Sequence, residues 1–309
     1  MLDLHSRVAS DSHRGGAPLR AARWTILALA VPALLASAAA ADGNVIAVVD
    51  AAGNLVAVGD ELDNRIDVGR LPLSTPNGYV VTGLQGTTVN GLPEVVLFAT
   101  GDVLLSMNGG DDRTRVDGFI PGNVAIHGGE GADFLALGCP VVGGDVLMTG
   151  GPGDDVVDIQ DTGLNQDLTV LTGAGADRIH FFFARVDGDA VLSTGSGDDV
   201  VDPAQTDFGG SVLLFTGFGD DRVEVENETE IAGSLLVVAS FGDDEVLIDE
   251  AVVEDHVLVL LGSGSDLLEV SQSSIGGLTL ADGGFGADAF SDDGSSTFAL
   301  GLLLFRFET

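Results

Sequence analysis

The residues best suited to chemistry are nine aspartates that return along the chain with a period of 22, varying by at most one. A Gly stands two positions before every one of them, and a second Gly stands four positions before seven of the nine. Carboxylate oxygens at a regular spacing can bind hard cations or accept backbone hydrogen bonds. These aspartates are Asp112, Asp133, Asp155, Asp177, Asp199, Asp221, Asp244, Asp266 and Asp288.

Apolar residues recur at fixed distances from each aspartate, and their pattern indicates the elements that position it. Side chains at two and four residues after the Asp alternate, as in Val157 and Ile159, and so do those nine and seven residues before it, as in Val146 and Met148. Such alternation predicts two short strands. Gly recurs about eleven residues before the Asp and an apolar residue about nine after it, which predicts a second corner and a shorter third side.

A single coil of this length cannot bury its own apolar side chains, so the coils must stack and share a core. The sequence therefore predicts an all-β protein, a parallel β-solenoid of about nine regular coils with irregular N-terminal coils and a C-terminal cap strand. We expect a cap with degenerate coils over 42–100, the regular solenoid over 101–290 and the C-terminal cap over 291–309. Asn64 takes the Asp place in the first degenerate coil.

Residues 1–41 read as a secretory signal peptide. Arg7, Arg14, Arg20 and Arg23 precede an apolar run over 24–36, and small residues follow it up to Ala41. The run is short for a helix that must cross a bilayer of about 30 Å. We therefore expect a secreted or cell-surface protein, the alternative being an uncleaved membrane anchor.

The charge balance of the chain limits the classes of molecule that it can bind. The chain has 48 acidic residues against 12 basic ones, a formal net charge of −36, which argues against binding to nucleic acids. Hydrophobic residues make up 45% of the chain, enough for a folded core. Cys139 is the single cysteine, so no intramolecular disulfide can form.

Stacking would place the nine aspartates in one column about 5 Å apart, where neighbouring charges repel by about 3.5 kcal/mol at an effective dielectric of about 20. Such a column favours cations, and Ca²⁺ suits oxygen ligands best. Further acids lie beside it at Asp111, Asp154, Asp198, Asp220 and Asp243. Two alternatives stay open: the carboxylates cap their own turns without metal, or Arg113, Arg178 and Arg222 neutralise part of the column.

The corner resembles the RTX, or haemolysin-type, calcium-binding repeat G-G-x-G-x-D-x-U-x, which builds a parallel β-roll with Ca²⁺ between stacked turns. The segments that carry the resemblance are 128–135, 150–157 and 283–288. It implies several Ca²⁺ ions, with the nine aspartates as ligands. The motif returns here once per coil, at the longer period given above, whereas RTX blocks repeat it every nine positions, so it can serve only one edge. RTX proteins are also typically exported without an N-terminal signal peptide.

No catalytic motif emerges, and the sequence favours a non-enzymatic role as an extracellular or cell-surface structural or adhesive module. Calcium is the expected partner, together with extracellular polysaccharide or cell-surface components. One alternative is a polysaccharide-active lyase or glycosidase of the β-helix type, with acid pairs such as Asp158 and Asp161. The absence of Lys and the few Arg disfavour it. The other alternative is a metal-free structural solenoid.

Overall fold

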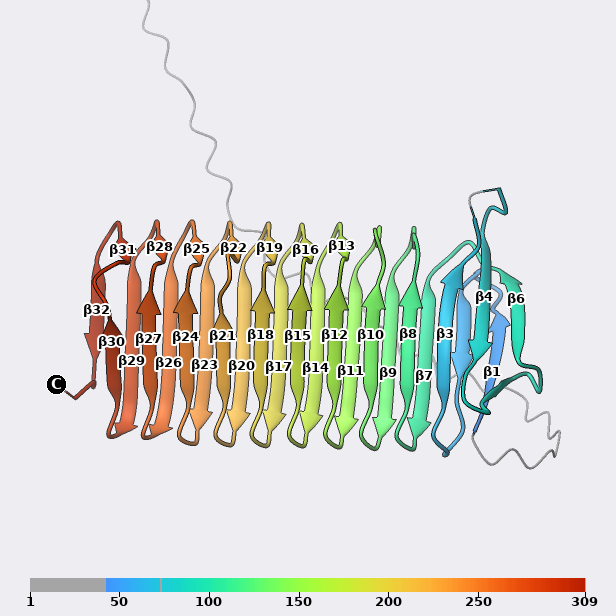
Figure 1. Ribbon diagram of the computed structural model, residues 1–309, viewed down its shortest axis with the longest axis horizontal. Coiled ribbons are helices and arrows are strands. Elements are labelled where there is room, and N and C mark those ends of the chain that lie inside the picture. Colours follow the sequence, from blue (N-terminus) through green and yellow to red (C-terminus); the bar gives the residue numbers. More distant parts are fainter. Residues whose placement is uncertain (1–42, 73, 309) are drawn as a thin grey trace, which may run out of the picture. The chain divides into compact units, whose positions relative to one another are not determined.

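The computed structural model describes residues 43–72 and 74–308, which wind into a β-solenoid of stacked coils (Figure 1). The signal peptide predicted over 1–41 lies outside these residues. Three β-sheets form the sides of the solenoid, because each regular coil contributes one strand to each of the two large sheets and seven of the nine coils contribute one to the third. In the coils of Asp112 and Asp133 the third side has only isolated bridges, at Ile120 and Val142. No helix within the described ranges is both long and apolar enough to cross a membrane.

The first sheet has 13 strands and contains the strand that precedes each predicted aspartate. From one edge to the other it contains β32 (Leu302–Phe305), β29 (Thr279–Gly286), β26 (Val257–Gly264), β23 (Leu235–Phe241), β20 (Val212–Phe218), β17 (Ala190–Ser196), β14 (Leu168–Ala174), β11 (Val146–Pro152), β9 (Val124–Glu130), β7 (Val103–Gly109), β2 (Leu55–Val58), β1 (Asn44–Val49) and β5 (Thr88–Val89).

The second sheet has 12 strands and contains the strand that follows each aspartate. Its order is β30 (Ala289–Asp292), β27 (Leu267–Ser271), β24 (Glu245–Asp249), β21 (Arg222–Val225), β18 (Val200–Ala204), β15 (Arg178–Phe182), β12 (Val156–Gln160), β10 (Phe134–Gly138), β8 (Arg113–Asp117), β3 (Arg65–Arg70), β4 (Gly78–Gly83) and β6 (Glu94–Phe98).

The third sheet is the short side that the sequence predicts, with seven strands of two residues each. They are β13 (Gly163–Leu164), β16 (Arg185–Val186), β19 (Asp207–Phe208), β22 (Glu230–Ile231), β25 (Val252–Val253), β28 (Ser274–Ile275) and β31 (Thr297–Phe298).

The register confirms the predicted solenoid. Leu135 pairs with Val157, and Val157 pairs with Ile179, so each lap of the chain places like residues above one another. The alternating apolar residues point inward and form one continuous core that runs through all the coils. Cys139 is fully buried in this core. Burial raises the pKa of its thiol to about 12, so it is an inert packing residue.

The N-terminal end departs from the parallel pattern. Strands β2 and β3 form a true coil, because they pair in parallel with β7 and β8. Beyond that coil the longer strands pair antiparallel: β1 with β2, β3 with β4, and β4 with β6. The two-residue strand β5 pairs in parallel with β1. The residues between 70 and 100 thus form mainly antiparallel strands over the end of the core, which a search for repeats could not show because the register of the repeat is lost there.

Candidate functional site

The nine predicted aspartates lie in one column at the corner between the 13-stranded and 12-stranded sheets. Asp155, for example, follows β11 and directly precedes β12. All nine side chains are turned inward and are at most 3% exposed. The structure therefore brings the predicted residues together, but at the inner side of the corner and away from solvent. We call this set the aspartate column.

A hydrogen-bond ladder joins the members of the column along the solenoid. In each coil from Asp133 onward, Oδ1 accepts the backbone N–H of the equivalent Asp in the preceding coil, at 2.7 to 3.2 Å. Asp112 accepts the N–H of Asn64 in the same way. This carboxylate hydrogen bond links neighbouring coils. In the alternative without metal, each carboxylate would instead cap its own turn.

The second oxygen of each column carboxylate, Oδ2, takes no part in the hydrogen-bond ladder. Oδ2 of all nine column aspartates is buried and has no hydrogen-bond partner. Burial, together with the charges of neighbouring column members, raises the pKa of Asp155 and of Asp244 to about 7. It also raises the pKa of Asp133 to about 6. A carboxylate in this position favours a proton or a cation beside it.

In several coils the residue five positions before the column Asp affects its carboxyl group. In the coils of Asp177, Asp199 and Asp221 this residue is Thr172, Thr194 or Thr216, whose hydroxyl offsets part of the rise in pKa. In the coils of Asp133 and Asp155 it is Gly128 or Gly150. A Cβ at either glycine would lie 2.1 Å from Oδ2, so only glycine leaves room for the carboxylate.

The glycine two positions before each Asp is required by the close approach of neighbouring coils. Gly153 has a φ of +139°, and a Cβ there would lie 1.9 Å from the carbonyl oxygen of Gly131 in the preceding coil. The same contact recurs between Gly175 and Gly153 at 2.0 Å. The carbonyls of these glycines thus point from one corner toward the next.

The neighbouring acids form a second, exposed ladder on the outside of the same corner. Oδ1 of Asp111 accepts the N–H of Ala132 in the next coil, and Asp154 accepts that of Ala176. Asp198, Asp220 and Asp243 continue the pattern. These five acids are called the outer acidic row. The arginines expected to neutralise the column do not reach it: Arg178 pairs with Asp202, Arg222 with Glu224 and Glu245, and Arg113 covers the ring of Phe134.

A further ladder, which the sequence reasoning missed, runs along the corner that precedes the 13-stranded sheet. There Oδ1 of Asp145 accepts the N–H of Asp167, and Oδ1 of Asp167 accepts the N–H of Asp189. Asn54, Asp102 and Asn123 extend it toward the N-terminus. The signal was available, because these polar residues stand ten positions before the column aspartates from Asp102 onward.

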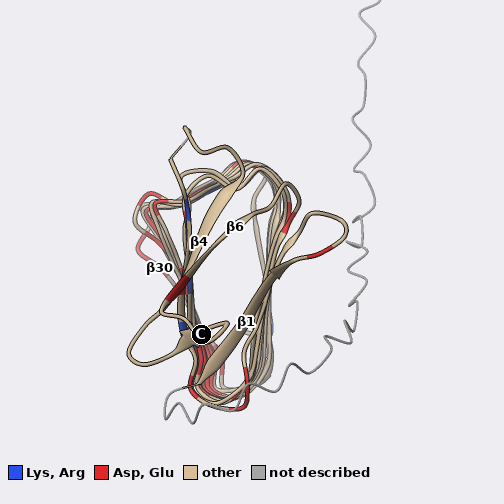
Figure 2. Ribbon diagram, turned by 90° about the vertical axis from the view of Figure 1, so that its right-hand side faces the viewer, with Lys and Arg blue, Asp and Glu red and all other residues tan. Residues whose placement is uncertain are grey.

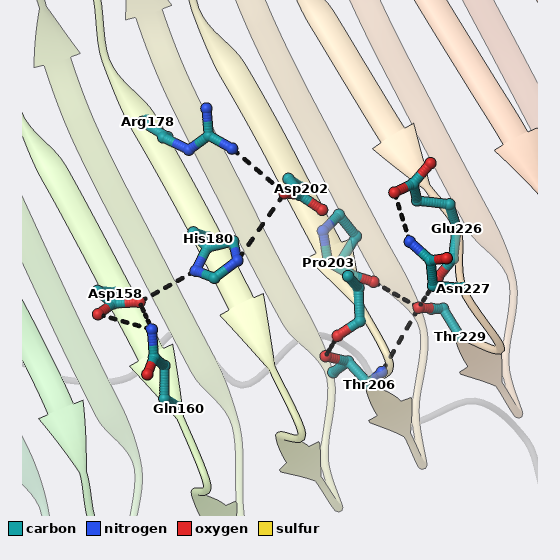
Figure 3. Close-up of polar contacts among 11 residues, drawn as sticks. Asp158, Gln160, Arg178, His180, Asp202, Pro203, Thr206, Glu226, Asn227 and Thr229 are labelled. Carbon is teal, nitrogen blue, oxygen red and sulfur yellow. Dashed lines mark hydrogen bonds and ion pairs between the residues drawn. The ribbon is translucent and has the colours of Figure 1, made fainter.

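The outer surface of the 12-stranded sheet carries a small ionic cluster (Figure 3). His180 lies between carboxylates of the two adjacent coils, with Nδ1 3.1 Å from Asp158 and Nε2 3.9 Å from Asp202. Arg178 is 3.3 Å from Asp202. Burial raises the pKa of Asp202, and His180 counteracts the rise. The sequence reasoning overlooked this cluster, although the three residues Asp158, His180 and Asp202 are spaced by 22.

The aspartate column offers oxygen ligands that a metal ion could use. Within residues 43–72 and 74–308, no group of three or more His, Cys, Asp and Glu side chains is arranged to hold a metal ion. The donor chemistry nevertheless suits a hard cation, because the column offers carboxylate oxygens without partners beside a column of backbone carbonyls. Comparisons with protein-family models, with curated proteins and with solved structures find no match for this chain. The resemblance to RTX repeats therefore rests on the corner motif.

Proposed function

We propose that the protein is an exported, non-enzymatic β-solenoid that acts as a structural or adhesive module outside the cell and binds Ca²⁺ along the aspartate column. The observation that supports this most is the column of buried carboxylates whose Oδ2 atoms lack partners, as at Asp155 and Asp244. Ca²⁺ would neutralise charges that burial disfavours and would tie neighbouring coils together.

The residues assigned to Ca²⁺ are the nine column aspartates, with carbonyl oxygens such as those of Gly131 and Gly153 nearby. Their main role without metal is already visible, because each carboxylate bonds to the backbone of the preceding coil. Calcium would add to this ladder, since a ligand that binds only the folded state stabilises it by mass action. Extracellular polysaccharide or cell-surface components are the partners that an adhesive module of this kind would contact.

Thermal unfolding with and without Ca²⁺ tests the proposal. We expect millimolar CaCl₂ to raise the melting temperature of the mature protein by several degrees over NaCl at matched ionic strength. Asp155→Asn should reduce that rise. Asp161→Asn removes the same charge from an exposed site outside the corner and serves as the matched control. An identical melting temperature in CaCl₂ and in EGTA would establish the metal-free structural solenoid instead.

A polysaccharide-active enzyme is the second candidate, and the cluster around His180 is the observation that favours it. Asp202 combines a raised pKa with a neighbouring His and Arg on an open sheet face. A carboxyl group of that kind could act as a general acid or base. Release of oligosaccharides from an acidic polysaccharide, abolished by Asp202→Asn, would support this candidate over the structural one.

A further inference from the structure

The outer side of the 13-stranded sheet carries an unbroken apolar column. Successive strands from β2 to β32 place one outward residue each directly above the last, and ten of these eleven residues are apolar while the other is Thr. None belongs to the contiguous core cluster. Val56, Ala125 and Leu147 are nevertheless buried, at most 9% exposed, and the other eight are half-buried or exposed. They are Val56, Leu104, Ala125, Leu147, Thr169, Val191, Leu213, Leu236, Leu258, Leu280 and Leu303.

A second outward column beside it becomes apolar toward the C-terminus, where Phe215, Val238 and Leu260 follow one another. Its one acid, Asp282, is paired with Arg306. At the ends of the same strands, the rings of Phe218 and Phe241 stack in parallel at 4.9 Å and are more than half exposed. We call the two columns together with these two rings the apolar face.

The charge of the molecule lies elsewhere (Figure 2). The equivalent outward column on the 12-stranded sheet reads Asp158, His180 and Asp202 in successive coils, and Glu269 lies farther along it. The apolar face therefore carries no unpaired acid, in a chain whose net charge is −36. A contiguous apolar surface of this length on a folded domain indicates a contact surface.

At the corner next to the apolar face, the hydrogen-bond ladder has no acid over the same coils, although Glu254 and Asp255 lie exposed in the turn before β26. The ladder that contains Asp145, Asp167 and Asp189 continues through Ser211, Ser234 and His256. In these coils a hydroxyl or an imidazole accepts the backbone N–H that a carboxylate accepts in earlier coils, and the ladder has no carboxylate charge there. The ladder positions without a carboxylate and the most apolar strands therefore coincide over β20, β23 and β26.

We infer that the apolar face is the site of self-association, in which a second copy of this chain packs face to face on the 13-stranded sheet. Two copies of so acidic a chain can approach without strong repulsion only through an uncharged surface. A flat sheet face is self-complementary and suits a two-fold interface, with the two sheets about 10 Å apart. A membrane is disfavoured as the occupant, because the acidic rows beside the face would be repelled by anionic lipids.

The dimensions are sufficient for a specific interface. Eleven strands at about 4.8 Å span roughly 50 Å, and the outward columns with the Phe rings cover a width of about 15 Å. Each copy would then contribute on the order of 700 Å², near the roughly 800 Å² per partner of a standard interface. This inference does not depend on calcium, because no column aspartate takes part in it.

Analytical ultracentrifugation of the full mature chain in EGTA tests the inference and keeps calcium bridging out of the measurement. We expect the wild type to sediment as a dimer at micromolar concentration. Leu236→Asp, in the middle of the apolar face, should weaken association at least tenfold and give a monomer. Val200→Asp is the matched control: Val200 is also half-buried and outward, but lies on the 12-stranded sheet between Arg178 and Arg222, which can pair with the new charge.

Circular dichroism and the melting temperature of a monomeric Leu236→Asp protein show whether the fold is kept, and Phe218→Ser offers a second variant that removes an exposed ring without touching the core. A wild type that remains monomeric at high micromolar concentration would overturn the inference. So would equal weakening by Leu236→Asp and Val200→Asp. Flotation of a monomeric wild type with neutral phosphatidylcholine vesicles would identify a lipid surface as the occupant and would also overturn it.

Discussion

Asp155 shows how one buried carboxyl group can make the stability of the fold depend on pH. Burial raises its pKa from 3.8 to about 7, so between those values the folded chain holds a proton that the unfolded chain has released. Stability gained from this proton is complete below about pH 4 and is lost as the pH rises through 7. Asp112 and Asp244, whose pKa values are also raised to about 7, act in the same direction.

We therefore expect the calcium-free protein to become more stable when the pH falls from 8 to 5, the opposite of the usual behaviour of salt-bridged acids. Urea denaturation in EGTA at a series of pH values measures this. Asp155→Asn should raise stability at pH 8 and have little effect at pH 5, because the amide keeps the acceptor and removes the charge. Asn64 is the native precedent: it is fully buried at this register, and its Nδ2 donates to the carbonyl of Leu62 at 2.6 Å. A flat pH profile for both proteins would show that the column carries no titrating charge.

At the scale of the turn and its strands, the glycines set the distance between coils. A side chain at Gly153 would meet two obstacles, the positive φ and the carbonyl oxygen of Gly131. The strands β11 and β12 on either side are locked in register with their neighbours, so the corner cannot move away without breaking both ladders. The Gly-x-Gly part of the motif thus follows from stacking, and it is needed with or without calcium.

The close approach of the coils predicts a graded loss of stability for two glycine variants. Gly153→Ala should cost about 3 kcal/mol or more, because backbone strain and overpacking add together. Gly91→Ala carries only the strain of a φ of +75°, since nothing lies within 4 Å of its Cβ position, and should cost about 1 kcal/mol. Urea midpoints measured at equal m-values give the comparison. Similar losses at the two positions would mean that close approach of the coils is not what selects glycine.

At the scale of the whole molecule, acidic and apolar residues lie on different surfaces. The outer acidic row, the ladder from Asp102 to Asp189 and the outer side of the 12-stranded sheet carry carboxylates, whereas the 13-stranded sheet is nearly free of them. Stacking repeats each charge at every coil, so like charges accumulate in rows. The same repetition aligns apolar residues into a continuous surface.

Rows of exposed like charges predict that the monomer is stabilised by simple salt. Raising NaCl from low concentration to about 0.15 M shortens the screening length to about 8 Å, which weakens repulsion within the outer acidic row. The urea midpoint should rise, while the buried column remains unscreened and keeps its pH dependence. Leu236→Asp is the suitable background for this measurement, because it separates folding from association. A midpoint that is independent of salt would contradict the expected repulsion.

The spacing of residues along the chain was enough to determine the coil, its three sides and the alignment of the nine aspartates. A period of 22 with alternating apolar positions has one compact solution, in which each lap stacks on the last. Asn64 could be placed in the column on the same basis. The antiparallel strands around β4 and β6 could not be predicted, since the repeat ends there and pairing is decided by long-range contacts.

Only the tertiary structure decided which way each repeated side chain points and what it meets. The period places Asp133 above Asp112 but does not distinguish an exposed ligand from a buried acceptor; the fold makes it buried and bonded to the neighbouring coil. Leu236 is a second case, because its apolar character alone does not place it, and its strand leaves it outside the core. The physical reason is that spacing fixes positions along a strand, whereas orientation and burial depend on the twist of each corner and on the neighbours supplied by other coils.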